Sequence, residues 1–190
     1  MPVKDFILAS GSPQRKHLLE QIGYAPKKID PADIDESVKK GEAATAYVKR
    51  MSIEKALKIS QKNPNEVVLG SDTIVVVGRT ILHKSKNDEE QTKVMELLSG
   101  KAHKVITSVC VIDKSGKPSV RVVATRILMK KLSQQEILDY VATHEWVGAV
   151  GYKVEGCLAA FVKKIIGSYS GVVGLPLFEA RNLLIGAGVK

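Results

Sequence analysis

The stretch EVVLGSDTIVVV, residues 66–77, is a strongly β-forming segment of this chain. Two apolar runs rich in β-branched residues flank Gly70-Ser71-Asp72. Strand interiors disfavour aspartate, and a buried carboxylate needs a cation or a metal beside it. The pattern therefore predicts a β segment broken at these three residues, with Asp72 at a strand end or bulge that faces a cleft. A purely structural turn aspartate is the alternative.

Helical and β patterns interleave on both sides of this segment. Upstream, we expect a strand at 6–9, a helix at 13–22, an irregular stretch at 26–43 and a helix at 44–61. Downstream, we expect a helix at 87–98, strands at 103–112 and 119–129 joined by a hairpin turn, and helices at 133–143 and 176–186. Because the hairpin interrupts the alternation, the sequence predicts a mixed α/β fold with a partly antiparallel sheet.

Composition indicates one compact domain, residues 1–190, with two lobes that share a core. Of 190 residues, 44% are hydrophobic and 26% are charged, and no apolar run approaches the roughly 20 residues of a membrane helix. The start MPVKD is not typical of a signal peptide. Cys110 and Cys157 form no CxxC pair or metal-spaced set. We therefore expect no disulfide scaffold and no membrane association, and we expect a cytoplasmic protein.

The formal net charge is +9, which favours polyanionic partners such as nucleic acid, nucleotides or an anionic membrane. Many of the lysines are spread along the expected helix faces, so a solvated basic surface is the simpler interpretation. No motif typical of a nucleic-acid-binding protein is present, and only 5% of residues are aromatic, which leaves few stacking platforms. Nucleic-acid binding is therefore disfavoured, although the charge leaves it open.

The stretch SGSPQRK, residues 10–16, joins the first expected strand to a helix. Ser12 is a good N-cap and Pro13 suits the first helical position. Free N–H groups and the dipole at such a terminus attract anions, Gly11 allows a close approach, and Arg15 adds positive charge. The spacing of a Walker A loop is absent. The stretch predicts either an ordinary capped helix or a phosphate site.

Four further residues are candidates for ionic chemistry. Glu36 closes the acidic run DIDE and is either a solvated loop acid or, if the fold brings it near Asp72, one of two carboxylates that can hold Mg²⁺ with waters and phosphates. Lys55 either snorkels from an apolar helix face or points its ammonium at a phosphate. Lys84 is either a surface lysine or a further cation. His103 opens a strand, and its simplest interpretation is structural.

Taken together, these segments resemble the Maf family of nucleotide pyrophosphatases. The resemblance runs in order over nearly the whole chain, and the combination is specific although each motif alone is weak. The matching motifs are LASGSP at 8–13, IDES at 34–37, YV at 47–48 with Lys55, GSDTIV at 70–75, LSG at 98–100 with His103, and GSYSGVVGLPL at 167–177.

The resemblance implies two lobes around a central cleft, as in inosine triphosphatases, and a homodimer. It implies hydrolysis of a nucleoside triphosphate between the α and β phosphates, with Mg²⁺ or Mn²⁺ as the metal. By the family pattern, Asp72 is the general base and Glu36 is a further catalytic position, and these two carboxylates are the expected metal ligands. The other matching positions are Lys55 and Lys84 among the catalytic residues, and Ser10, Gly11, Ser12 and Arg15 in the phosphate-binding loop.

Three positions that match the family's specificity residues disagree here. Thr73 agrees with the members that act on pyrimidine triphosphates, but Gln14 stands where those members carry an arginine. Glu155 stands where they carry glutamine, and a carboxylate there resembles the branch that acts on 7-methyl-GTP, because it accepts hydrogen bonds from a guanine-like N–H edge. The segment 145–152 is shortened and lacks the family's lysine.

The leading hypothesis is a metal-dependent nucleoside triphosphate pyrophosphatase. It would clear nonstandard or modified nucleotides, with pyrimidine triphosphates or 7-methyl-GTP as substrates. The alternative is a weakened Maf-like nucleotide- or nucleic-acid-binding protein linked to cell division arrest, which the missing lysine and the charge of +9 favour. The enzyme is preferred because all four charged residues matched to its active site are retained.

Overall fold

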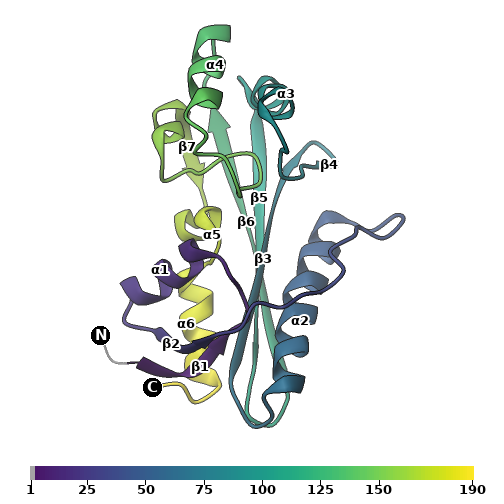
Figure 1. Ribbon diagram of the computed structural model, residues 1–190, viewed down its shortest axis with the longest axis vertical. Coiled ribbons are helices and arrows are strands. Elements are labelled where there is room, and N and C mark those ends of the chain that lie inside the picture. Colours follow the sequence, from purple (N-terminus) through teal and green to yellow (C-terminus); the bar gives the residue numbers. More distant parts are fainter. Residues whose placement is uncertain (1–2) are drawn as a thin grey trace.

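The computed structural model describes residues 3–190 as a mixed α/β fold built on one seven-stranded sheet (Figure 1). Met1 and Pro2 lie outside the described residues. They belong to the start MPVKD, which is not typical of a signal peptide. The strands are β1 (Val3–Leu8), β2 (Ala25–Ile29), β3 (Val68–Val77), β4 (Thr80–Ile81), β5 (Ala102–Ile112), β6 (Pro118–Met129) and β7 (Val162–Ile166).

The helices flank this sheet. They are α1 (Pro13–Gln21), α2 (Ala44–Lys62), α3 (Asp88–Leu98), α4 (Gln134–Ala142), α5 (Tyr169–Val173) and α6 (Leu177–Gly186), with a 3-10 helix, η1 (Cys157–Phe161). None of the helices within residues 3–190 is both long enough and apolar enough to cross a membrane.

The sheet is mixed in direction. Its order is β2-β1-β3-β5-β6-β7, and the short β4 pairs with the end of β3. β1 runs parallel to β2 and β3, whereas the remaining pairs are antiparallel. The hairpin turn between β5 and β6 is fixed by Asp113, whose side chain accepts hydrogen bonds from the backbone N–H groups of Ser115 and Lys117. The predicted fold class is therefore confirmed.

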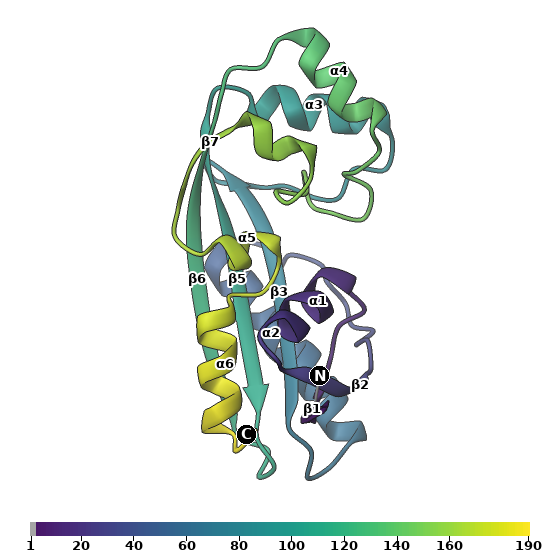
Figure 2. The same cartoon turned by 90° about the vertical axis from the view of Figure 1, so that its left-hand side faces the viewer.

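Two lobes are joined through the long strands β3, β5 and β6 (Figures 1 and 2). In one lobe, α1 and α6 pack on one face of the sheet, with Leu19 and Leu184 in the contact, and α2 covers the other face through Ile59. In the other lobe, α3 and α4 form a separate apolar cluster that includes Met95 and Tyr140. The long strands thus connect two separately packed ends of the molecule.

β3 runs through Gly70-Ser71-Asp72 without a break, so the interruption predicted there is wrong. Asp72 pairs with Ser108 of β5 in the middle of the strand, not at an end or a bulge. Gly70 is needed because a Cβ there would lie 2.7 Å from the Ser52 carbonyl oxygen of α2. The glycine thus allows close helix packing and does not end the strand.

Residues 26–43 are less irregular than predicted, because β2 occupies their start as an edge strand parallel to β1. Lys27 and Lys28 are exposed in this strand, so it lacks the apolar alternation that reveals a half-buried strand in a sequence. Residues 30–43 contain neither helix nor strand, and they carry Glu36 to the side of α2.

Candidate active site

A cleft of about 740 Å³ opens between the two lobes. Its size falls in the range of small-molecule sites, roughly 300–1,000 Å³. Every residue that the sequence assigned to catalysis, phosphate binding or specificity lines it. These residues are Ser10, Gly11, Ser12, Gln14, Arg15, Glu36, Lys55, Asp72, Thr73, Lys84 and Glu155.

Lys55 is the ionic centre of the cleft floor. Its Nζ lies 2.7 Å from Asp72 Oδ1 and 2.8 Å from Glu36 Oε1. The side chains of Lys55 and Asp72 are 10% and 11% exposed, whereas that of Glu36 is 55% exposed. The fold therefore brings Glu36 beside Asp72 through a shared cation. These three groups carry one net negative charge, which favours a further cation.

The helical period of α2 places this lysine. Tyr47, Met51 and Lys55 follow one another at i, i+4 and i+8 on its buried face. Lys55 therefore faces inward to Asp72 and does not snorkel to solvent. The Tyr47 hydroxyl donates a 2.8 Å hydrogen bond to the Glu36 carbonyl oxygen and ties that segment to α2. Burial, assisted by the charges of Asp72 and Glu36, raises the pKa of Tyr47 to about 12, so it remains a donor at neutral pH.

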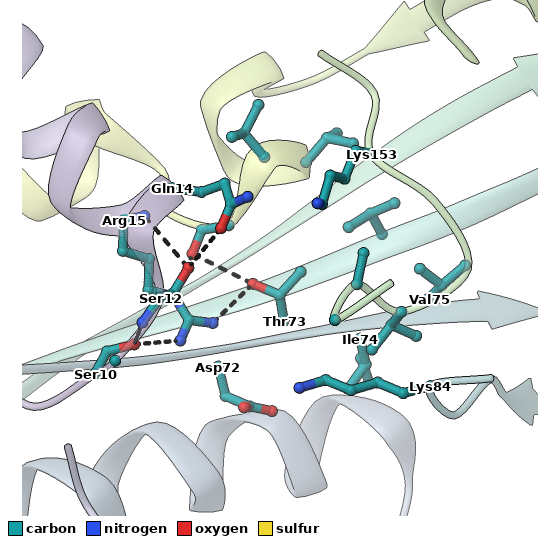
Figure 3. A pocket seen from close by; sticks show the side chains of 18 of the residues that line it. Ser10, Ser12, Gln14, Arg15, Asp72, Thr73, Ile74, Val75, Lys84 and Lys153 are labelled. Atoms are coloured by element: carbon teal, nitrogen blue, oxygen red, sulfur yellow. Dashed lines mark hydrogen bonds between the residues drawn. The ribbon is translucent and has the colours of Figure 1, made fainter. Parts of the chain in front are cut away.

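The segment from Ser10 to Arg15 forms a second wall of the cleft (Figure 3). Ser12 caps α1, since its Oγ accepts from the Arg15 backbone N–H at 3.4 Å, and Pro13 takes the first helical position. Arg15 also donates from Nη1 to Ser10 Oγ at 2.9 Å. A helix N-terminus, its polar cap and a guanidinium thus meet at the cleft, a combination that suits an anion.

The carbonyl oxygen of Gly174 organises this wall. It accepts hydrogen bonds from Arg15 Nε at 3.0 Å, Ser71 Oγ at 3.2 Å and Thr73 Oγ1 at 3.3 Å. Arg15 Nη2 also donates to Thr73 Oγ1 at 3.4 Å, and Thr107 Oγ1 lies 3.1 Å from it, so the Thr73 hydroxyl contacts three neighbours. Sequence reasoning missed Gly174. The available signal was a glycine in the VVGLP motif, which here has a φ of +137° that L residues rarely adopt.

The other lobe supplies Lys84 and the loop 147–155. Lys84 extends toward Asp72, and Lys153 points into the cleft from the loop (Figure 3). Lys153 was missed because sequence reasoning looked for a lysine earlier, in the shortened segment. Its position two residues before Glu155 was the available signal, since alternate residues of an extended segment share a side. Glu155 is exposed at the rim.

The residue types fit a divalent cation. Lys55 contacts one oxygen of each carboxylate, and no hydrogen bond or ion pair within residues 3–190 reaches the second oxygen of Asp72 or Glu36. Mg²⁺ is usually held by one or two carboxylates together with waters and substrate phosphates. No third metal-ligating side chain joins this pair in the described chain, so substrate oxygens would complete the coordination.

Arg15 belongs to the same electrostatic site as the two carboxylates. Burial lowers the pKa of its guanidinium, whereas the charges of Asp72 and Glu36 raise it. Three of its five N–H groups are bonded to protein oxygens, and the other two have no partner among residues 3–190. The guanidinium is thus held by three hydrogen bonds at the wall of the cleft.

Comparison of the sequence with models of protein families assigns the chain to a family. The family model described as Maf-like protein matches residues 5–187. The chain belongs to the Maf-like protein family. The match confirms the resemblance that the ordered sequence motifs indicated, and it covers both walls of the cleft of this Maf-like chain.

Two relatives match nearly the whole chain, and one solved structure matches part of it. The "dTTP/UTP pyrophosphatase" of Zymomonas mobilis is 44% identical over 183 residues, which are 96% of this chain and 91% of that protein. The "Nucleoside triphosphate pyrophosphatase" of Neorickettsia sennetsu is 46% identical over 97% of this chain and 89% of that protein. The crystal structure of a dITP/XTP pyrophosphatase from Mycobacterium abscessus is 12% identical, with a TM-score of 0.44 over 70% of this chain and 76% of that chain.

Proposed function

We propose that this Maf-like protein is a nucleoside triphosphate pyrophosphatase that releases the monophosphate and pyrophosphate. One observation carries the proposal: Lys55 joins two carboxylates on the floor of a cleft whose neighbouring wall presents a capped helix N-terminus and Arg15. A site that bound nucleotides without a metal would gain nothing from Asp72, because a buried carboxylate repels phosphate. The printed names of the relatives from Zymomonas mobilis and Neorickettsia sennetsu support the same activity.

The cleft residues divide the chemistry among them. A water oxygen attacks the α-phosphorus, the bond to the α–β bridging oxygen breaks, and its electron pair leaves with pyrophosphate. Asp72 is the proposed acceptor of the proton of the water, while its Oδ1 stays bonded to Lys55. Arg15, Lys84 and the N-terminus of α1 absorb negative charge that develops on the phosphate oxygens. Lys55 holds Asp72 in place from below.

Mg²⁺ or Mn²⁺ is the proposed cofactor, and Glu36 and Asp72 would hold it together with substrate oxygens. When bound, such a metal supplies charge neutralisation at the phosphate oxygens. Lys55 keeps the two carboxylates close to each other in the structure. The protein therefore orients the donors, and the substrate brings the remaining ligands.

Pyrimidine triphosphates are the proposed substrates, since relatives are named for dTTP and UTP. Thr73 fits this class and is held by hydrogen bonds to its neighbours in the wall. The Gln14 side-chain oxygen accepts from Ser12 Oγ at 3.2 Å, which leaves its amide N–H groups for the substrate. Glu155 favours a guanine-like N–H edge instead, so 7-methyl-GTP is the second candidate.

A panel of nucleoside triphosphates tests this proposal. UTP, dTTP, CTP, ATP, GTP, ITP and 7-methyl-GTP are incubated with the protein and with Mg²⁺, Mn²⁺ or a chelator, and pyrophosphate and free phosphate are measured separately. We expect equal amounts of pyrophosphate and monophosphate from UTP and dTTP, and none with the chelator. Absence of turnover by folded protein contradicts the proposal and favours the binding alternative, while release of free phosphate contradicts the bond assignment.

Asp72→Asn tests the proposed base. Asparagine keeps the shape and can still accept from Lys55, so the variant should fold. Loss of a general base lowers kcat by about 10²–10⁴-fold. Asp139→Asn, an exposed aspartate on α4, is the matched control and should retain wild-type kcat. Full turnover by Asp72→Asn would show that another group takes the proton.

A further inference from the structure

Gln91 is a buried polar residue at a position that otherwise belongs to the core. It lies on α3 in line with Met95 and Leu98, at i, i+4 and i+7, and the two apolar residues pack in the second lobe. Gln91 is 1% exposed. A buried amide is costly unless both of its ends are hydrogen-bonded, so its partners are informative.

Both ends of this amide are bonded, and each partner lies next to the cleft. Gln91 Nε2 donates to the Gly151 carbonyl oxygen at 2.6 Å. Gln91 Oε1 accepts from Ser85 Oγ at 2.8 Å. The orientation of the amide follows from chemistry, because a carbonyl oxygen can only accept and must face the NH₂ group.

The two partners belong to the two cleft segments that the second lobe contributes. Ser85 directly follows Lys84, and Gly151 lies two residues before Lys153 in the loop 147–155. One side chain thus joins the segment that carries a proposed catalytic cation to the loop that carries a specificity residue, although the bonded groups lie 60 and 6 positions from it in sequence.

The same loop has a second buried polar contact next to the first. Tyr152 OH and His103 Nε2 lie 2.5 Å apart, and both residues are buried. Burial lowers the pKa of His103 to about 4, so the ring is neutral at pH 7. The loop is therefore attached to β5 through Tyr152 and to α3 through the neighbouring Gly151. Of the two buried side chains that hold it, His103 and Gln91, only Gln91 also bonds the segment that carries Lys84.

We propose that Gln91 is a positioning residue that sets the pose of Lys84 and of the loop 147–155 together. It touches no reacting atom and acts through Ser85 and Gly151. This inference rests on the proposed pyrophosphatase function for its kinetic consequences, whereas the tether itself is independent of that function. Losing the Ser85 bond should disturb Lys84 and hence kcat, and losing the Gly151 bond should disturb the loop and hence the choice of base.

Hydrogen exchange tests the tether without any substrate. Gln91→Met keeps the length and burial of the side chain and removes both hydrogen bonds, Ser85→Ala removes one, and Met95→Leu is the packing control on the same helix face. For Gln91→Met we expect exchange at residues 82–86 and 147–153 to rise about fivefold in each segment, the value of one net hydrogen bond. Ser85→Ala should raise exchange at residues 82–86 only. Met95→Leu should raise exchange in neither segment.

The proposed tether is contradicted if Gln91→Met exchanges as slowly as the wild type in both segments. It is also contradicted if Met95→Leu raises exchange as much as Gln91→Met does. If Gln91→Met does not fold, Ser85→Ala still decides, because unchanged exchange at residues 82–86 contradicts the proposal. With the activity established, Gln91→Met should lower kcat and also change the ratio of UTP to 7-methyl-GTP turnover, whereas Ser85→Ala should lower kcat alone. A wild-type protein without turnover defeats the proposed function but leaves the exchange result standing.

Discussion

Replacing Lys55 by methionine should cost stability as well as activity, because it removes the cation beside a buried carboxylate. Lys55 Nζ lies 2.7 Å from Asp72 Oδ1, and both side chains are about one-tenth exposed. Removing one partner of a buried ion pair costs about 3–5 kcal/mol, and we expect the lower end, about 3 kcal/mol, because the cleft admits water. Glu36 is half exposed and adds at most about 1 kcal/mol.

Urea denaturation at pH 7 measures this loss of unfolding free energy. Lys58→Met is the matched control, since Lys58 is exposed on the same helix, and it should stay within about 0.5 kcal/mol of wild type. The double variant Lys55→Met/Asp72→Asn should recover about 2 kcal/mol, because a neutral asparagine needs no cation. The reasoning is refuted if Lys55→Met is no less stable than Lys58→Met, or if the two losses simply add.

Three further predictions concern other parts of the cleft. Arg15→Lys keeps the charge but loses the guanidinium fork that bonds Ser10 and Gly174, so steady-state kinetics should show KM raised about tenfold with a smaller change in kcat, and an unchanged KM would contradict a phosphate role. Burial lowers the pKa of His103 from 6.5 to about 4, so the unfolded state takes up the proton first, and the stability that is present above about pH 6.5 is lost as pH falls toward 4. Urea titrations should show wild type losing about 2–3 kcal/mol more than His103→Gln between pH 7 and pH 4.5, whereas equal losses would show that this histidine is not held neutral. Glu155→Gln should shift the ratio of turnover toward UTP and away from 7-methyl-GTP, and an unchanged ratio would remove Glu155 from base recognition.

Local chemistry predicted where several helices begin. Ser12 and Pro13 start α1 as expected, because the cap and the first-turn proline act within a few residues. Ser133 and Glu136 form both bonds of the predicted capping box that opens α4. Signals of this kind depend on neighbours in sequence, so one sequence suffices to find them.

The errors lie where distant residues decide the structure. The sequence predicted a break in β3 because polar residues interrupt an apolar run, but Ser71 bonds Gly174 on one side of the sheet and Asp72 bonds Lys55 on the other. Such partners compensate the cost of burying polar groups. The edge strand β2 escaped notice because its exposed lysines conceal any period.

In the candidate site, too, the sequence indicates which residues take part but not which distant residues contact one another. Resemblance to a family supplied the set of candidate residues, and all of them line the cleft. Their contacts could not be derived from the sequence, since Arg15 and Gly174 lie 159 positions apart. Lys153 was missed because its direction into the cleft depends on how the loop 147–155 folds. Gln91 was missed because its partner Gly151 lies 60 positions away in sequence.

Hydrolysis of UTP in water enriched in ¹⁸O, followed by mass analysis of both products, tests the central claim most directly. Attack of water on the α-phosphorus, with Asp72 as the base, predicts one ¹⁸O atom in the monophosphate and none in pyrophosphate. Label in pyrophosphate would place the attack on the β-phosphorus and contradict the proposed geometry. Release of labelled free phosphate would contradict the pyrophosphatase assignment itself.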